Sequence, residues 1–166
     1  SLVKILLKSQ LKNIHSIEGY QEIFKSLMDQ MIKTSISNLE VEGISNLDSK
    51  SQYLFISNHR DISLDAALLN LSLNRAGHKT FNMAVGNNLM KEKWASDLMR
   101  LNKSFIIQRS GNKKEIYMGL SLASQFIQHT ILEAGESIWI AQKQGRAKDG
   151  IDETDPAMLK MIHLTE

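Results

Sequence analysis

The sequence contains no cysteine among its 166 residues. This absence excludes disulfide scaffolds, cysteine-ligated zinc sites and cysteine nucleophiles. The five histidines are scattered without the spacing of metal ligands, so we expect no metal site. The chain also lacks a paired-glycine dinucleotide fingerprint and a Walker-type lysine pattern, which argues against nucleotide binding. We therefore expect no cofactor.

Long apolar runs are missing as well. No stretch of about 18 or more apolar residues exists, so no transmembrane helix is expected within these residues. The run Leu2–Leu7 is too short for a signal peptide and is interrupted by Lys4. The chain starts at Ser1 without an initiator methionine and ends at Glu166 just after an apolar run, which indicates a fragment of a longer protein.

The bulk composition is that of an ordinary globular domain, with 42% hydrophobic and 23% charged residues. The length fits one domain with a substantial core. A net charge of +2 is too weak to predict a nucleic-acid partner, so the placement of the cations matters more than their sum.

Residues 1–36 are predicted to form an N-terminal amphipathic helical segment. Apolar residues recur at helical spacing, and Lys4, Lys8 and Lys12 form one row of i, i+4 neighbours. Two interpretations remain open: a helix lying on an anionic membrane surface, or a helix packed on the domain with a solvated lysine row.

Residues 37–166 are predicted to form an α/β domain. Strand-like and helical runs alternate, which indicates βαβ units and a mostly parallel central sheet flanked by helices. The strand-like runs are 53–56, 80–85, 103–108 and 137–141, with a further alternating stretch at 37–44; the helical runs are 66–73, 92–101 and 113–132.

Polar turns follow four of these strand-like runs. They contain Asn58-His59, Gly86-Asn87, Arg109 and Gly145-Arg146. Because active sites of parallel sheets gather beyond the carboxyl ends of the strands, we expect these turns to converge on one edge.

His59 is the leading candidate for a general base. It lies at a strand-to-helix turn, where a nearby acid can fix the imidazole tautomer, and both Asp61 and Asp65 are close in sequence. Either aspartate could instead serve the dipole of the following helix, and His59 itself could be a hydrogen-bonded turn residue.

The cations that follow the later strands are candidates for anion binding. Arg109 leaves the end of a buried strand, and Arg146 follows Gly145 in a turn rich in glycine and cations, with Lys148 nearby. An arginine fork can bind two phosphate oxygens. A surface salt bridge for Arg109 and a plain solvent turn at Gly145 are the alternatives.

Together these turns resemble, over about residues 37–150, the glycerophospholipid acyltransferase family, which includes glycerol-3-phosphate and lysophosphatidic acid acyltransferases. The first family block, Asn-His followed by Asp, is similar to Asn58-His59 through Asp65. The second is similar to Gly86-Asn87-Asn88-Leu89 with Phe105–Arg109, and the third to Gln144-Gly145-Arg146.

The sequence departs from the family pattern at three places. Five residues rather than four separate His59 from Asp65, so Asp61 is a second candidate for the acid. Gln144 stands where the family has glutamate, and no threonine precedes Arg146. The fourth family block, a strand with a proline near its start, is not visible.

The resemblance implies an acyltransferase of phospholipid synthesis with acyl-CoA or acyl carrier protein as donor and a glycerol phosphate or lysophospholipid as acceptor. It implies a position on the cytoplasmic membrane face. A non-catalytic domain that binds phospholipid or phosphate is the alternative, and a hydrolase without a nucleophile elbow is a third. The catalytic candidates are His59, Asp65 and Asp61; the substrate-binding candidates are Asn58, Arg60, Asn87, Arg109, Gly145, Arg146 and Lys148.

Overall fold

The computed structural model describes residues 16–61, 64–89 and 93–164. The chain divides into two compact units, Ser1–Glu42 and Gly43–Glu166. The first unit contains helix α2 (Ile17–Ser35), which begins where the Ser16 side chain accepts a hydrogen bond from the N–H of Gly19 (3.1 Å). The predicted helix is confirmed over this range, while its first part lies outside the described residues.

A four-stranded, fully parallel sheet organises the second unit. Its strands are β1 (Leu54–Ser57), β2 (Asn82–Gly86), β3 (Ser104–Ile107) and β4 (Ile138–Ala141), in the order β1-β4-β2-β3. Register pairs Leu54 with Ile138, and Met83 with both Ser104 and Trp139. All four carboxyl ends therefore lie at one edge of the sheet, as the sequence predicts.

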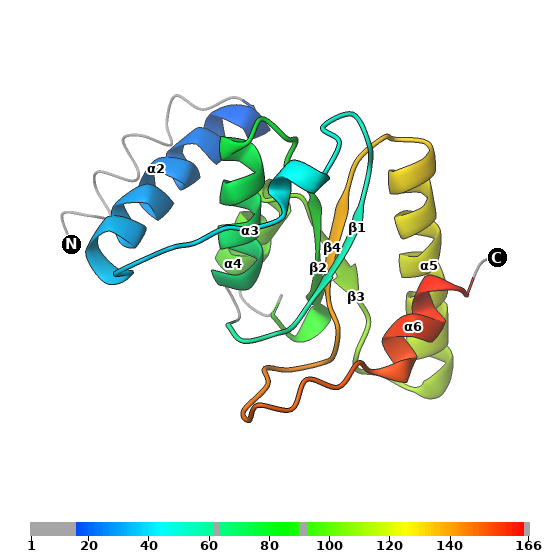
Figure 1. The fold of residues 1–166 in the computed structure, drawn as a ribbon. Coiled ribbons are helices and arrows are strands. Elements are labelled where there is room, and N and C mark those ends of the chain that lie inside the picture. The colour runs from blue at the N-terminus through cyan, green and yellow to red at the C-terminus, as the bar shows by residue number, and fades with distance from the viewer. Residues whose placement is uncertain (1–15, 62–63, 90–92, 165–166) are drawn as a thin grey trace. The chain divides into compact units, whose positions relative to one another are not determined.

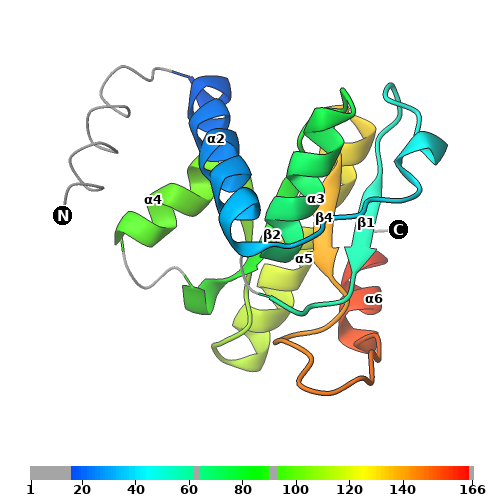
Figure 2. The same cartoon turned by 60° about the vertical axis from the view of Figure 1, so that its left-hand side comes forward.

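Helices cover both faces of this sheet (Figures 1 and 2). Helix α5, which begins with a capping box formed by Asn112 and Glu115, packs with the short α6 on one face. Helix α3 lies on the other face, and α4 contacts β3. The bounds are α3 (Leu64–Arg75), α4 (Lys93–Leu101), α5 (Lys113–Leu132) and α6 (Pro156–Ile162), with 3-10 turns η1 (Ile44–Asn46) and η2 (Asn87–Leu89).

Alternate residues of β1, β2 and β4 contribute to two separate apolar cores, whereas β3 contributes Phe105 and Ile107 to one of them. Ile138 and Ile140 of β4 pack with Phe105 toward α5 and α6. Trp139, between them in sequence, points to the other face, where it stacks on Phe81 with ring centroids 6.4 Å apart. Burial on both faces explains the continuous apolar run of β4, whereas Ile56 of β1 and Ile106 of β3 are exposed.

Two elements differ from expectation. Residues 37–44 alternate as a strand would, but that prediction is wrong: the structure has no strand there, and Val41 is 48% exposed. Alternation shows only that one side of an extended segment is apolar, and a strand also needs a partner. Helix α6 was not predicted, although Asp155 caps it and Pro156 occupies its first turn, a usual helix start.

Among the described residues, no helix is both long enough and apolar enough to span a membrane.

Glu136 gives the fold a pH-dependent contact near the amino ends of β2 and β4. Asn82 Nδ2 donates to Glu136 Oε2 (2.6 Å), and Lys103 Nζ lies 3.3 Å from Oε1. Burial raises the pKa of Glu136, but the hydrogen bond from Asn82 and the charge of Lys103 outweigh it and hold the pKa below 4.5. The ionised carboxylate therefore stabilises the folded state.

We expect Glu136→Gln to lower the free energy of unfolding at neutral pH. A depressed pKa contributes stability that is present above the unfolded value near 4.5 and is lost as pH falls through the folded value. The gap between wild type and variant should therefore shrink below about pH 4.5. Urea unfolding at pH 7 and pH 3 measures both gaps, and equal gaps would contradict the assignment.

Candidate functional site

A cavity of about 580 Å³ opens at the carboxyl ends of the strands. This size suits a small-molecule site. Its wall takes residues from the turns after β1, β2, β3 and β4, so segments far apart in sequence share it. The lining residues are His59, Arg60, Met83, Ala84, Val85, Gly86, Asn88, Leu89, Arg109, Trp139, Ala141, Gly145, Arg146, Ala147 and Lys148.

His59 and Asp65 form a hydrogen-bonded pair at this cavity. His59 Nδ1 lies 2.9 Å from Asp65 Oδ2, and the two side chains are only 14% and 15% exposed. The same carboxylate accepts hydrogen bonds from the backbone N–H groups of Arg60 (2.8 Å) and Asp61 (3.0 Å). An ionised carboxylate only accepts, so in the neutral imidazole Nδ1 is the nitrogen that carries the proton and Nε2 is the one with the lone pair.

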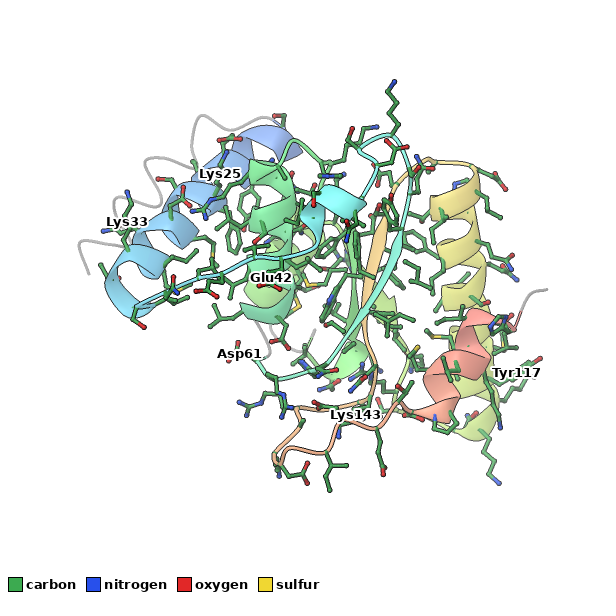
Figure 3. The ribbon with its side chains drawn as sticks, viewed as in Figure 1. Lys25, Lys33, Glu42, Asp61, Tyr117 and Lys143 are labelled. Carbon is green, nitrogen blue, oxygen red and sulfur yellow. The ribbon has the colours of Figure 1, made fainter. Side chains whose placement is uncertain are left out.

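Asp61 has a different place. Its Oδ1 accepts a hydrogen bond from the N–H of Leu64 (2.8 Å), the first residue of α3. Asp61 therefore stabilises the start of α3, which is one of the two roles that the sequence left open for it. Asp65, in the first turn of α3, reaches back across the turn to His59 in spite of the longer spacing. Figure 3 shows Asp61 at the same end of the sheet as Lys143 of the turn after β4.

Arg109 reaches the cavity from the turn after β3. Asn87 Oδ1 accepts from the Arg109 N–H (3.2 Å), and Asn87 Nδ2 donates to Ser110 Oγ (3.0 Å), so this amide fixes the turn. Gly86 leaves room for the arginine, since a Cβ there would lie 3.0 Å from Arg109 Cδ. Burial lowers the pKa of Arg109, and the charge of Asp155 opposes this. A half-buried guanidinium stays protonated and favours an anion.

The turn after β4 supplies two more cations. Gly145 has φ +76°, a conformation that glycine adopts without strain, and it turns the chain so that Arg146 and Lys148 line the cavity. The side chains of Arg109, Arg146 and Lys148 form no hydrogen bond or salt bridge with the part of the chain that the structure describes. Gln144 is exposed and is not part of the lining.

Three of the predicted substrate-binding residues have protein partners. Asn58 Nδ2 donates to Asp152 Oδ2 (2.7 Å), and Arg60 binds the same oxygen and the carbonyl of Asp149 (2.7 Å). Asn87 supports the Arg109 turn as described. Arg60 still lines the cavity, whereas Asn58 and Asn87 do not. Substrate contacts of these residues stay a prediction.

Sequence reasoning missed the apolar floor of the cavity. Met83 and Val85 of β2 and Trp139 and Ala141 of β4 lie on the sheet face that carries α3. These strands were predicted to be buried on both faces. Both faces of such a strand are equally apolar in sequence, so the sequence does not show which residues line the cavity. No group of three or more potential metal ligands occurs within residues 16–61, 64–89 and 93–164.

The site therefore combines an imidazole, a carboxylate hydrogen-bonded to it, and three cations whose side chains form no hydrogen bond or salt bridge with the described residues, all around one cavity. Such a set can deprotonate an alcohol whose negatively charged group is held nearby. No curated protein matches the sequence. Residues 38–158 match the family model described as Acyltransferase. The match covers more than half of the chain and includes every residue of the site, so this chain belongs to the Acyltransferase family.

Proposed function

We propose that this protein transfers a fatty acyl group from a thioester, acyl-CoA or acyl carrier protein, to a hydroxyl of a glycerol phosphate or lysophospholipid. The observation that carries the proposal is the 2.9 Å bond between His59 Nδ1 and Asp65 Oδ2 in the cavity that Arg109, Arg146 and Lys148 also line. The base and the cations come from turns after three different strands.

In the proposed reaction His59 Nε2 removes the proton of the acceptor hydroxyl. The hydroxyl oxygen attacks the thioester carbonyl, a carbon–oxygen bond forms, and the carbon–sulfur bond breaks. The thiolate leaves with the proton that His59 took up, so no covalent enzyme intermediate is needed. Asp65 stabilises the imidazolium that exists between the two proton transfers.

The cations would bind the phosphate of the acceptor. Arg109 and Arg146 offer planar forks for two oxygens, and Lys148 adds a point charge. A held phosphate keeps the hydroxyl next to the base and supplies the orientation term of catalysis. The apolar floor at Met83, Val85 and Trp139 suits the acyl group or the glycerol carbons.

A peripheral position on the cytoplasmic membrane face is part of the proposal. The lipid acceptor lies in a membrane, and helix α2 carries Lys25 and Lys33 along its length (Figure 3). Such a helix can bind an anionic surface through its cations and apolar residues.

The test is thiol release from a long-chain acyl thioester in the presence of glycerol-3-phosphate or lysophosphatidic acid. We expect Arg146→Ala and Arg109→Ala each to raise the acceptor KM about 10–100-fold, because a charge-assisted hydrogen bond contributes about 1.5–3 kcal/mol. The donor KM should stay constant. Lys160→Ala, on α6 and outside the cavity, is the matched control with unchanged KM.

Two outcomes would count against catalysis. Wild-type protein that binds the phosphate acceptor but releases no thiol would favour the non-catalytic binding domain. Equal acceptor KM values in wild type and both arginine variants would remove the phosphate assignment.

A further inference from the structure

We propose that Asp152 is a positioning residue that locks the His59 turn to the loop carrying Arg146 and Lys148. The inference rests on the proposed function and adds to it a residue that touches neither substrate nor base. Asp152 lies in the loop between β4 and α6, far along the chain from His59. Neither its sequence position nor any family block singles it out.

The contacts of Asp152 enclose His59 from both sides in sequence. Its Oδ2 accepts a hydrogen bond from Asn58 Nδ2 (2.7 Å) and forms an ion pair with the Arg60 guanidinium. The side chain of Asp152 is 19% exposed and that of Arg60 is 48% exposed, so water screens this ion pair from the arginine side and the carboxylate is the more buried partner. One carboxylate oxygen thus holds the two residues that flank the base.

One backbone hydrogen bond and one from the Arg60 guanidinium also join the same two segments. The N–H of Ala147 donates to the carbonyl of His59 (2.7 Å), and Arg60 also donates to the carbonyl of Asp149 (2.7 Å). Ala147 stands between Arg146 and Lys148, the two cations of the cavity wall. A movement of the His59 turn therefore displaces the backbone that carries both cations, and the reverse also holds.

The loop is closed at its base as well. The N–H of Gln142 donates to the carbonyl of Ser57 (2.9 Å), and the N–H of Asp155 donates to the carbonyl of Gln142 (2.9 Å). Residues 143–154 thus start and end beside the carboxyl end of β1, where they run below the sheet in Figure 1. Between these fixed ends, the side chains of Asn58 and Arg60 in the His59 turn both contact Asp152 of the loop.

The second oxygen of Asp152, Oδ1, makes an unfavourable contribution to folding that the contacts of Oδ2 offset. Oδ1 is buried and has no hydrogen-bond partner among the described residues. A buried polar atom without a partner is unfavourable, so the Oδ2 contacts to Asn58 and Arg60 must offset it. The functional consequence is a fixed separation between the base and the phosphate-binding cations, on which the approach of the hydroxyl to Nε2 depends.

The kinetic test compares Asp152→Ala with Glu153→Ala, which removes the neighbouring exposed carboxylate. We expect Asp152→Ala to lower kcat about 10–100-fold, since a misplacement of about 1 Å can have that effect. The acceptor KM should rise several-fold with the donor KM unchanged, a split that a smaller folded fraction would not produce. Asp152→Asn keeps one acceptor oxygen and should fall between the alanine variant and wild type. Glu153→Ala should match wild type.

A second readout does not need activity. The amide hydrogen of Ala147, which bonds the His59 carbonyl, should exchange with solvent at least about tenfold faster in Asp152→Ala than in Glu153→Ala, as the loop opens more often. Equal exchange rates, or kinetic constants within twofold of wild type, would overturn the positioning role. Wild-type protein without thiol release would instead contradict the proposed function, while the exchange rates still decide whether Asp152 locks the loop.

Discussion

Replacing His59 with alanine is expected to lower kcat by about 10²–10⁴-fold, the usual contribution of a positioned general base. The only proton acceptor placed beside the cavity with a fixed tautomer is then gone from the described site. The fold should persist, because Asp65 keeps its hydrogen bonds from the backbone N–H groups of Arg60 and Asp61. Thiol release measures the rate, and thermal unfolding checks the fold.

His129 provides a matched control for this experiment. Its Nδ1 lies 2.9 Å from Glu133 Oε2, the same contact that His59 makes with Asp65, but on the exposed surface of α5 away from the cavity. His129→Ala therefore removes a carboxylate-paired imidazole without touching the site and should retain wild-type kcat. Full activity of His59→Ala with an intact fold would remove His59 as the base.

The fold class and the meeting of the polar turns could be predicted from the sequence because both follow from local patterns and one general rule. Alternating apolar runs identify strands and helices, and parallel strands bring their carboxyl ends to one edge. His59, Arg109 and Arg146 share a cavity for that reason. No knowledge of the order β1-β4-β2-β3 was needed, since any order of parallel strands leaves these turns at the same edge.

The choice between Asp61 and Asp65 could not be made from spacing. Asp61 is nearer to His59 in sequence, yet its carboxylate turns to the N–H of Leu64. The contacts that separate the two carboxylates are tertiary ones, which spacing along the chain does not give. The family spacing did not decide between them either, because Asp65 lies one position later than the family pattern places its aspartate.

Long-range pairing limited the prediction of the remaining site residues. Asn58 and Arg60 were predicted to bind substrate, but Asp152 engages both of them. A sequence pattern shows which polar residues lie at the carboxyl ends of the strands. It does not show which of them form hydrogen bonds or ion pairs with one another. Among the described residues, the cavity cations whose side chains form no hydrogen bond or salt bridge are Arg109, Arg146 and Lys148, and these remain available to a ligand.

Replacing Asp65 with asparagine is expected to have the second-largest effect, a fall in kcat of about 10²–10⁴-fold. The asparagine oxygen can still accept from the backbone N–H groups of Arg60 and Asp61, so its NH₂ group would face His59 Nδ1. Nδ1 must then become the acceptor, and the proton moves to Nε2. The imidazole would keep its place but present a proton to the acceptor hydroxyl where a lone pair is needed.

Asp61→Asn separates this tautomer effect from a general change in the turn. An asparagine at the start of a helix still accepts from the N–H of Leu64, so we expect kcat within a few-fold of wild type. Both variants replace one aspartate by asparagine, and they differ only in which aspartate near His59 is replaced. If Asp61→Asn lost as much activity as Asp65→Asn at equal thermal stability, the assignment of Asp65 as the partner that orients His59 would be wrong.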